Sequence, residues 1–120
     1  MRVVASAFII LVAALHLYFP VLEMFLWRTP FGRRTFGTTV EAAESSAVLA
    51  ANQGLYNGFL SAGLLWGLLA YGVIGGRPIV TFFLGCVILA GVYGAITVSR
   101  RILLVQAAPA AIATALLWLS

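Results

Sequence analysis

The sequence has very little charge and almost none of the residues that usually ligate metals. Charged residues make up 8% of its 120 positions, it contains no lysine, and histidine and cysteine occur once each. Soluble domains average about a quarter charged residues, so the composition excludes an ordinary soluble domain. A lone Cys86 excludes an internal disulfide. One histidine and one cysteine give no ligand spacing of the kind that zinc or haem sites use, and we expect no metal and no cofactor.

The seven basic residues are all arginines, and they give the chain a net charge of +4. They occur singly or in pairs at the ends of apolar runs. This placement is typical of residues that anchor and orient a protein at a membrane surface. We therefore expect no nucleic acid among the partners.

Four long runs separate these charges. They cover 25, 32, 22 and 19 residues, and Glu23 is the only charge within them. A helix needs about 20 apolar residues to cross a bilayer. The pattern predicts an all-α integral membrane protein, a four-transmembrane-helix bundle with the lipid bilayer as its partner. A signal peptide is the alternative for the first run, but its length and the polar His16 and Glu23 favour a membrane span.

The predicted bundle is one transmembrane domain, residues 1–120. Its helices cover about 3–27, 40–74, 79–99 and 103–119.

The connection 28–39 reads as a loop, because Pro30, Gly32 and Gly37 are frequent helix breakers. Thr38 and Glu41 have the spacing of a capping box, which indicates a helix that starts near residue 40.

The arginines also predict an orientation. The connections 28–39 and 100–102 lie at one end of the bundle and hold five arginines, whereas the other end holds Arg2 and Arg77. The excess of basic residues on the cytoplasmic side places both connections in the cytoplasm. We expect a multi-pass protein of the plasma (inner) membrane, with both termini outside the cytoplasm.

The first helix carries two residues that are costly in lipid. His16 and Glu23 are seven residues apart, so they share one helix face about 10 Å apart along the axis. Ionisable groups inside a membrane are functional candidates by default. Pro20 lies between them and removes a backbone hydrogen bond.

Polar residues of the other helices fall at similar depths. When the four helices are aligned by their arginine-rich ends, every helix contributes polar side chains to the cytoplasmic half, while the outer half is apolar. The alignment predicts a polar pocket inside the bundle that opens toward the cytoplasm. Its expected members are His16, Glu23, Asn52, Gln53, Tyr56, Asn57, Tyr93 and Gln106.

Three functions fit such a pocket. The first is binding or transport of a small polar or amphipathic molecule, proton-linked through Glu23 and His16. The second is an intramembrane enzyme that uses the same two residues as acid and base on a lipid-soluble substrate. The third is a structural protein whose polar groups only specify helix packing. The sequence places no serine near His16 for a nucleophilic triad. We therefore assign no catalytic residue and do not favour the enzyme.

Small residues recur every four positions in the second helix, at Ala50, Gly54, Gly58 and Ala62. Such a ridge lets a neighbouring backbone approach closely. The neighbour is either a helix of the same chain or a second copy, so a homo-oligomer stays open.

Several of these stretches resemble the domain of unknown function 1304 family. The resemblance covers nearly the whole chain and is most specific in the block Asn-Gln-Gly-Leu-Tyr-Asn-Gly-Phe at 52–59. Further matches are Ala14–Tyr18, Leu22–Trp27, Gly91–Gly94 and Gln106–Ala110. The resemblance implies a small four-helix bacterial membrane protein, and it implies no particular activity.

Overall fold

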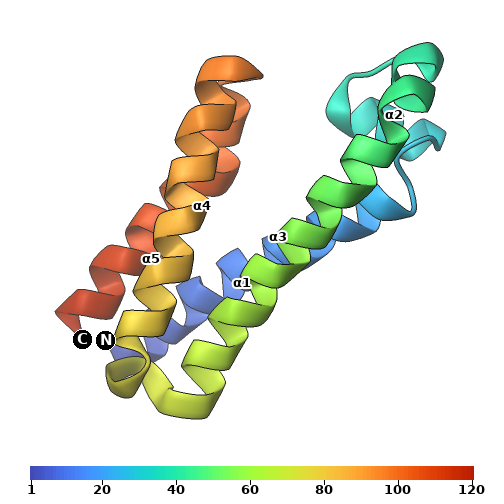
Figure 1. The fold of residues 1–120 in the computed structure, drawn as a ribbon. Helices are drawn as coiled ribbons and strands as arrows, with labels where there is room; N and C mark the ends of the chain where they lie inside the picture. The colour runs from blue at the N-terminus through green and yellow to red at the C-terminus, as the bar shows by residue number, and fades with distance from the viewer. The chain divides into compact units, whose positions relative to one another are not determined.

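The computed structural model describes all 120 residues as helices and short connections, with no strands. Figure 1 shows the elements in chain order. They are α1 (Arg2–Met24), α2 (Pro30–Phe36), α3 (Val40–Gly75), α4 (Arg77–Thr97), the π-helix η1 (Leu103–Ala107) and α5 (Ala108–Leu119). The prediction of an all-helical protein is therefore confirmed.

Helix α1 contains Pro20 and ends at Met24, three residues before the predicted end at Trp27. The regular i to i−4 hydrogen-bond pattern of the helix ends here. The amide of Leu26 is shared between the carbonyls of Val21 and Leu22, each at 3.2 Å. Bifurcated bonds of this type are common where a helix ends.

The prediction of a loop over residues 28–39 is wrong in part, because this segment contains the short helix α2. Pro30 occupies the first turn, where a missing N–H costs nothing. Thr29 precedes it as the N-cap, and its hydroxyl accepts a 3.2 Å hydrogen bond from the amide of Gly32. Gly37 ends the helix in the left-handed conformation, with φ of 64°. Of the three residues that suggested breakers, Pro30 and Gly37 are thus the two ends of a helix, and Gly32 lies inside it.

Helix α3 starts at Val40, close to the predicted position, but its cap differs from the prediction. The hydroxyl of Thr39, rather than that of Thr38, accepts the hydrogen bond from the amide of Ala42, at 3.1 Å. Near its other end, Gly72 has φ of 78° and ψ of −179°. Essentially only glycine adopts this conformation, which turns the chain toward α4.

The last helical segment contains an irregularity that the sequence analysis did not anticipate. The amide of Ala108 bonds to the carbonyl of Leu103, five residues back, so Leu103–Ala107 forms a π-helix. Pro109 follows directly and cannot donate a backbone hydrogen bond. The π-helical turn therefore lies directly before this proline, and the regular α-helix α5 begins at Ala108.

The chain divides into two compact units. The first comprises residues 1–14 and 60–120, and the second comprises residues 15–59. Helices α1 and α3 each contribute to both units. In the first unit, α4 packs against η1 and α5 (Figure 1).

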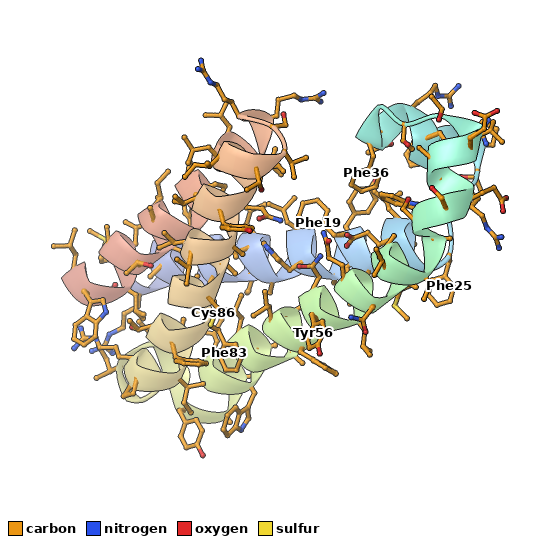
Figure 2. All side chains as sticks on the ribbon, turned by 45° about the horizontal axis from the view of Figure 1, so that its top comes forward. Phe19, Phe25, Phe36, Tyr56, Phe83 and Cys86 are labelled. Atoms are coloured by element: carbon orange, nitrogen blue, oxygen red, sulfur yellow. The ribbon has the colours of Figure 1, made fainter.

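The first unit holds the apolar core. The ring of Phe83 covers Gly63, where an added Cβ would lie 2.3 Å from the ring (Figure 2). Its buried residues are Ile9, Val12, Ala13, Leu64, Leu68, Val80, Leu84, Val87, Ala110, Ala113 and Leu117.

Three helices are long and apolar enough to cross a membrane, namely α1, α3 and α4. The apolar segment Leu103–Leu119 is a shorter helix. Many large apolar side chains of these helices are exposed, among them Leu69, Leu89 and Ile96. Exposed apolar surface of this extent fits a multi-pass membrane protein, in which lipid covers it.

Candidate functional site

The second unit contains a buried carboxyl group with an amide partner. Glu23 on α1 is 3% exposed and Asn57 on α3 is 9% exposed. The side-chain nitrogen of Asn57 donates a 2.7 Å hydrogen bond to Oε1 of Glu23. Gln53, one turn before Asn57, is a second side-chain hydrogen-bond partner of the same carboxyl. A buried carboxyl group requires partners of this kind.

A glycine brings the two helices close enough for this bond. A Cβ added at Gly54 would lie 2.8 Å from Cγ of Met24, 3.1 Å from Cβ of Glu23 and 3.3 Å from Cα of Pro20. The face of α3 that carries the small residues thus packs directly against the turn of α1 that carries Glu23. Gly58, the next residue of the ridge, has only a 4.0 Å neighbour in Pro20.

His16 is also buried, at 1% exposed. Its ring packs edge to face against Phe19, which follows it by one turn on α1, with 5.4 Å between the ring centroids (Figure 2). The histidine is therefore enclosed by the protein rather than directed toward lipid.

The remaining predicted residues of the second unit lie nearer its surface. Asn52 and Gln53 are exposed. Tyr56 is 59% exposed, and its ring packs edge to face on Phe59 of the same helix (Figure 2). Of the polar block 52–57, Asn57 is the side chain that α3 buries.

Two predicted residues belong to the first unit. Tyr93 on α4 is 69% exposed. Gln106 lies in the π-helix and is half-buried, and an added Cβ at Gly91 would lie 3.1 Å from its Cβ. This close approach places Gln106 directly against α4.

An open pocket of about 510 Å³ lies next to Glu23 in the second unit. The end of α1 and the connection that follows it supply one side, and the second and third turns of α3 supply the other. The lining residues are Glu23, Met24, Phe25, Trp27, Arg28, Thr29, Ala47, Val48 and Ala51. Its volume is in the range of small-molecule sites, about 300–1,000 Å³.

Two polar contacts brace the outer part of this pocket. The indole nitrogen of Trp27 donates a 3.1 Å hydrogen bond to the hydroxyl of Ser46. A guanidinium nitrogen of Arg28 lies 3.6 Å from a carboxylate oxygen of Glu44, in an exposed ion pair. These residues lie outside the predicted pocket. The adjacent serines 45 and 46, close to the start of α3, were the available signal.

No three or more His, Cys, Asp or Glu side chains come together in a group that could hold a metal ion. The site offers instead one carboxyl group, neutral amide donors and an arginine at the rim.

Comparison with known proteins identifies the family. A family model described as "Protein of unknown function (DUF1304)" matches residues 10–118. The chain belongs to the DUF1304 family. The matched range includes all eight residues that the sequence analysis selected.

The chain is also similar to the "Uncharacterized protein YpaA" of Lactococcus lactis subsp. lactis (strain IL1403). It is 33% identical over 99 residues, which cover 81% of this chain and 82% of the relative. No solved structure matches the DUF1304 chain.

Proposed function

We propose that this DUF1304 protein binds and transports a small polar or amphipathic molecule at the pocket beside Glu23. The observation that carries the proposal is that Glu23 is both buried and part of the pocket lining. A carboxyl group at this depth is expensive to keep in a membrane helix, which favours a functional role. Proton coupling through Glu23 and His16 belongs to the same proposal.

The ligand chemistry follows from the lining. The carboxyl group of Glu23 suits a donor or a cationic group, and Met24, Phe25 and Val48 suit an apolar one. Arg28 at the rim adds a site for an acceptor. A molecule with a polar head and a short apolar part could contact the carboxyl group, the apolar side chains and the arginine together.

We further infer that Leu103–Leu119 is a fourth membrane span and that the protein resides in the plasma (inner) membrane. Five arginines in the connections 28–39 and 100–102, against Arg2 and Arg77 in the rest of the chain, support a cytoplasmic position for these connections. The pocket then faces the cytoplasm, because Arg28 and Thr29 are among its lining residues.

A second candidate is a purely structural role for the polar groups. The close approach at Gly54 and the Asn57–Glu23 hydrogen bond favour it, because small residues and interhelical hydrogen bonds are how membrane helices associate. The two candidates differ in whether removing the carboxyl charge affects solute movement or only stability.

Transport is tested with purified protein in liposomes that contain a pH-sensitive dye. A panel of amines, amino acids and short-chain fatty acids is added outside, and the internal pH is recorded. We expect at least one solute to change the internal pH faster with the wild type and with Glu41→Gln, whose carboxylate is exposed and outside the pocket, than in protein-free liposomes. Glu23→Gln should show only the protein-free rate. If the wild type equals protein-free liposomes for the whole panel, or if Glu23→Gln equals the wild type, the proposal is wrong and the structural role is favoured.

A further inference from the structure

Helix α2 combines adjacent basic residues with exposed aromatic rings. It contains Arg33 and Arg34 and no acidic residue. Phe31 is 46% exposed and Phe36 is 40% exposed. Phe31 and Arg34 are three residues apart, so they are neighbours on the helix surface.

This helix is held firmly at the end of α1. A Cβ added at Gly32 would lie 1.9 Å from the carbonyl oxygen of Leu26, so the backbones are in direct contact. The rings of Trp27 and Phe36 pack with their centroids 4.8 Å apart (Figure 2). The connection between α1 and α3 is therefore an ordered, packed helix rather than an irregular loop.

The nearby carboxylates leave the two arginines of α2 available for an external anion. Glu44 pairs with Arg28. Glu41 lies in the first turn of α3, where the helix dipole stabilises an acidic group. Arg33 donates one 2.6 Å hydrogen bond to the carbonyl of Arg28, and its guanidinium has four further N–H donors. Arg34 is exposed.

The location of α2 decides which anion is expected. It connects α1 to α3, two helices long and apolar enough to span a membrane, so it lies where lipid head groups begin. Exposed phenyl rings beside basic residues are typical of segments that lie in the membrane interface. A soluble phosphate would use the arginines but not the rings.

We propose that α2 is an interfacial lipid-binding helix: Arg33 and Arg34 bind the phosphate of an anionic phospholipid while Phe31 enters the acyl region. This site is separate from the pocket beside Glu23, and the proposal does not depend on the transport function.

The test measures lipid retention by the full chain in detergent, using native mass spectrometry with added phosphatidylglycerol or phosphatidylcholine. We expect the wild type to retain phosphatidylglycerol preferentially. Each basic residue near a charged membrane surface contributes about a fivefold change in binding, so Arg33→Gln/Arg34→Gln should weaken retention at least tenfold. The matched control is Arg100→Gln/Arg101→Gln, which removes the chain's other adjacent arginine pair, where no aromatic residue lies within five positions. It should weaken retention less than Arg33→Gln/Arg34→Gln does.

Two further measurements separate the alternatives. Phe31→Ser should weaken retention several-fold with both arginines present, and 10 mM inorganic phosphate should not displace the lipid. Equal losses in the two arginine double variants would mean non-specific attraction and would overturn the proposal. Displacement by phosphate, or an unchanged Phe31→Ser variant, would also overturn it. Circular dichroism of each variant verifies that the surface substitutions leave the helices intact.

Discussion

The side-chain amide of Asn57 and the carboxyl group of Glu23 are 2.7 Å apart and join helices through residues 34 positions apart in sequence. Both side chains are buried. The bond lies one turn from the close helix approach at Gly54, so hydrogen bonding and packing reinforce each other at this point. The first two predictions separate these contributions.

Replacing Asn57 with leucine keeps the branching of the side chain and removes the donor. We expect the free energy of unfolding to fall by about 1–2 kcal/mol, because a buried acceptor loses its partner. Asn52→Leu, on the exposed side of the same helix, should change it by less than about 0.5 kcal/mol. Denaturation of the purified protein in mixed micelles provides the measurement. A double-mutant cycle with Glu23→Leu that gives no coupling energy would show that the bond contributes nothing.

Packing is tested along the small-residue ridge of α3. Gly54→Ala should destabilise the protein by about 1–3 kcal/mol, since the added methyl group overpacks against Met24, Glu23 and Pro20. Gly58→Ala, one turn further on, meets only Pro20 at 4.0 Å and should be neutral or slightly stabilising. The same unfolding assay compares the two. Equal destabilisation by both would mean that the whole ridge, and not Gly54 alone, forms the contact.

Sequence reasoning found the polar residues but not which of them would be buried. In a soluble helix the apolar face identifies the core. In α3 the lipid-facing and protein-facing sides are both apolar, so the periodicity carries little information. Gln53, Asn57 and Ser61 follow one another at intervals of four residues on α3, yet Gln53 is exposed whereas Asn57 and Ser61 are buried. Ser61 donates a 2.8 Å hydrogen bond to the carbonyl of Ala13, a contact that depends on tertiary packing.

Local irregularities were harder to predict for a different reason. Pro30 and Gly37 are compatible with a loop and with the two ends of a short helix. The choice depends on Gly32 fitting against the carbonyl of Leu26. The π-helix before Pro109 likewise depends on how η1 packs on α4 at Gly91. In each case one residue pattern permits two local structures, and a contact with another element selects between them.

Arg77 is expected to stabilise the end of α5. Its guanidinium donates hydrogen bonds to the carbonyls of Leu117 at 3.4 Å and Ser120 at 2.7 Å, and it lies 5.1 Å from the ring centroid of Trp118. A cation at a helix C-terminus is favourable. Arg77→Gln should lower the free energy of unfolding by about 1–2 kcal/mol.

The control for this prediction is Arg77→Lys. It keeps the charge but loses the planar fork of donors, so it should recover only part of the stability. Full recovery by lysine would mean that charge alone matters. If Arg77→Gln itself is as stable as the wild type, the contacts with α5 do not contribute.

The membrane topology is testable with two engineered cysteines in a Cys86→Ala background. Thr35→Cys reports the side of α2, and Ser120→Cys reports the end of α5. Four spans place the two positions on opposite sides, because α3, α4 and the Leu103–Leu119 segment each cross once between them. A membrane-impermeant thiol reagent should then label Thr35→Cys only in inside-out vesicles and Ser120→Cys only in right-side-out vesicles. The reverse pattern would contradict the orientation inferred from the arginines. Labelling of both positions from one side would mean that Leu103–Leu119 does not cross, so that the protein has three spans.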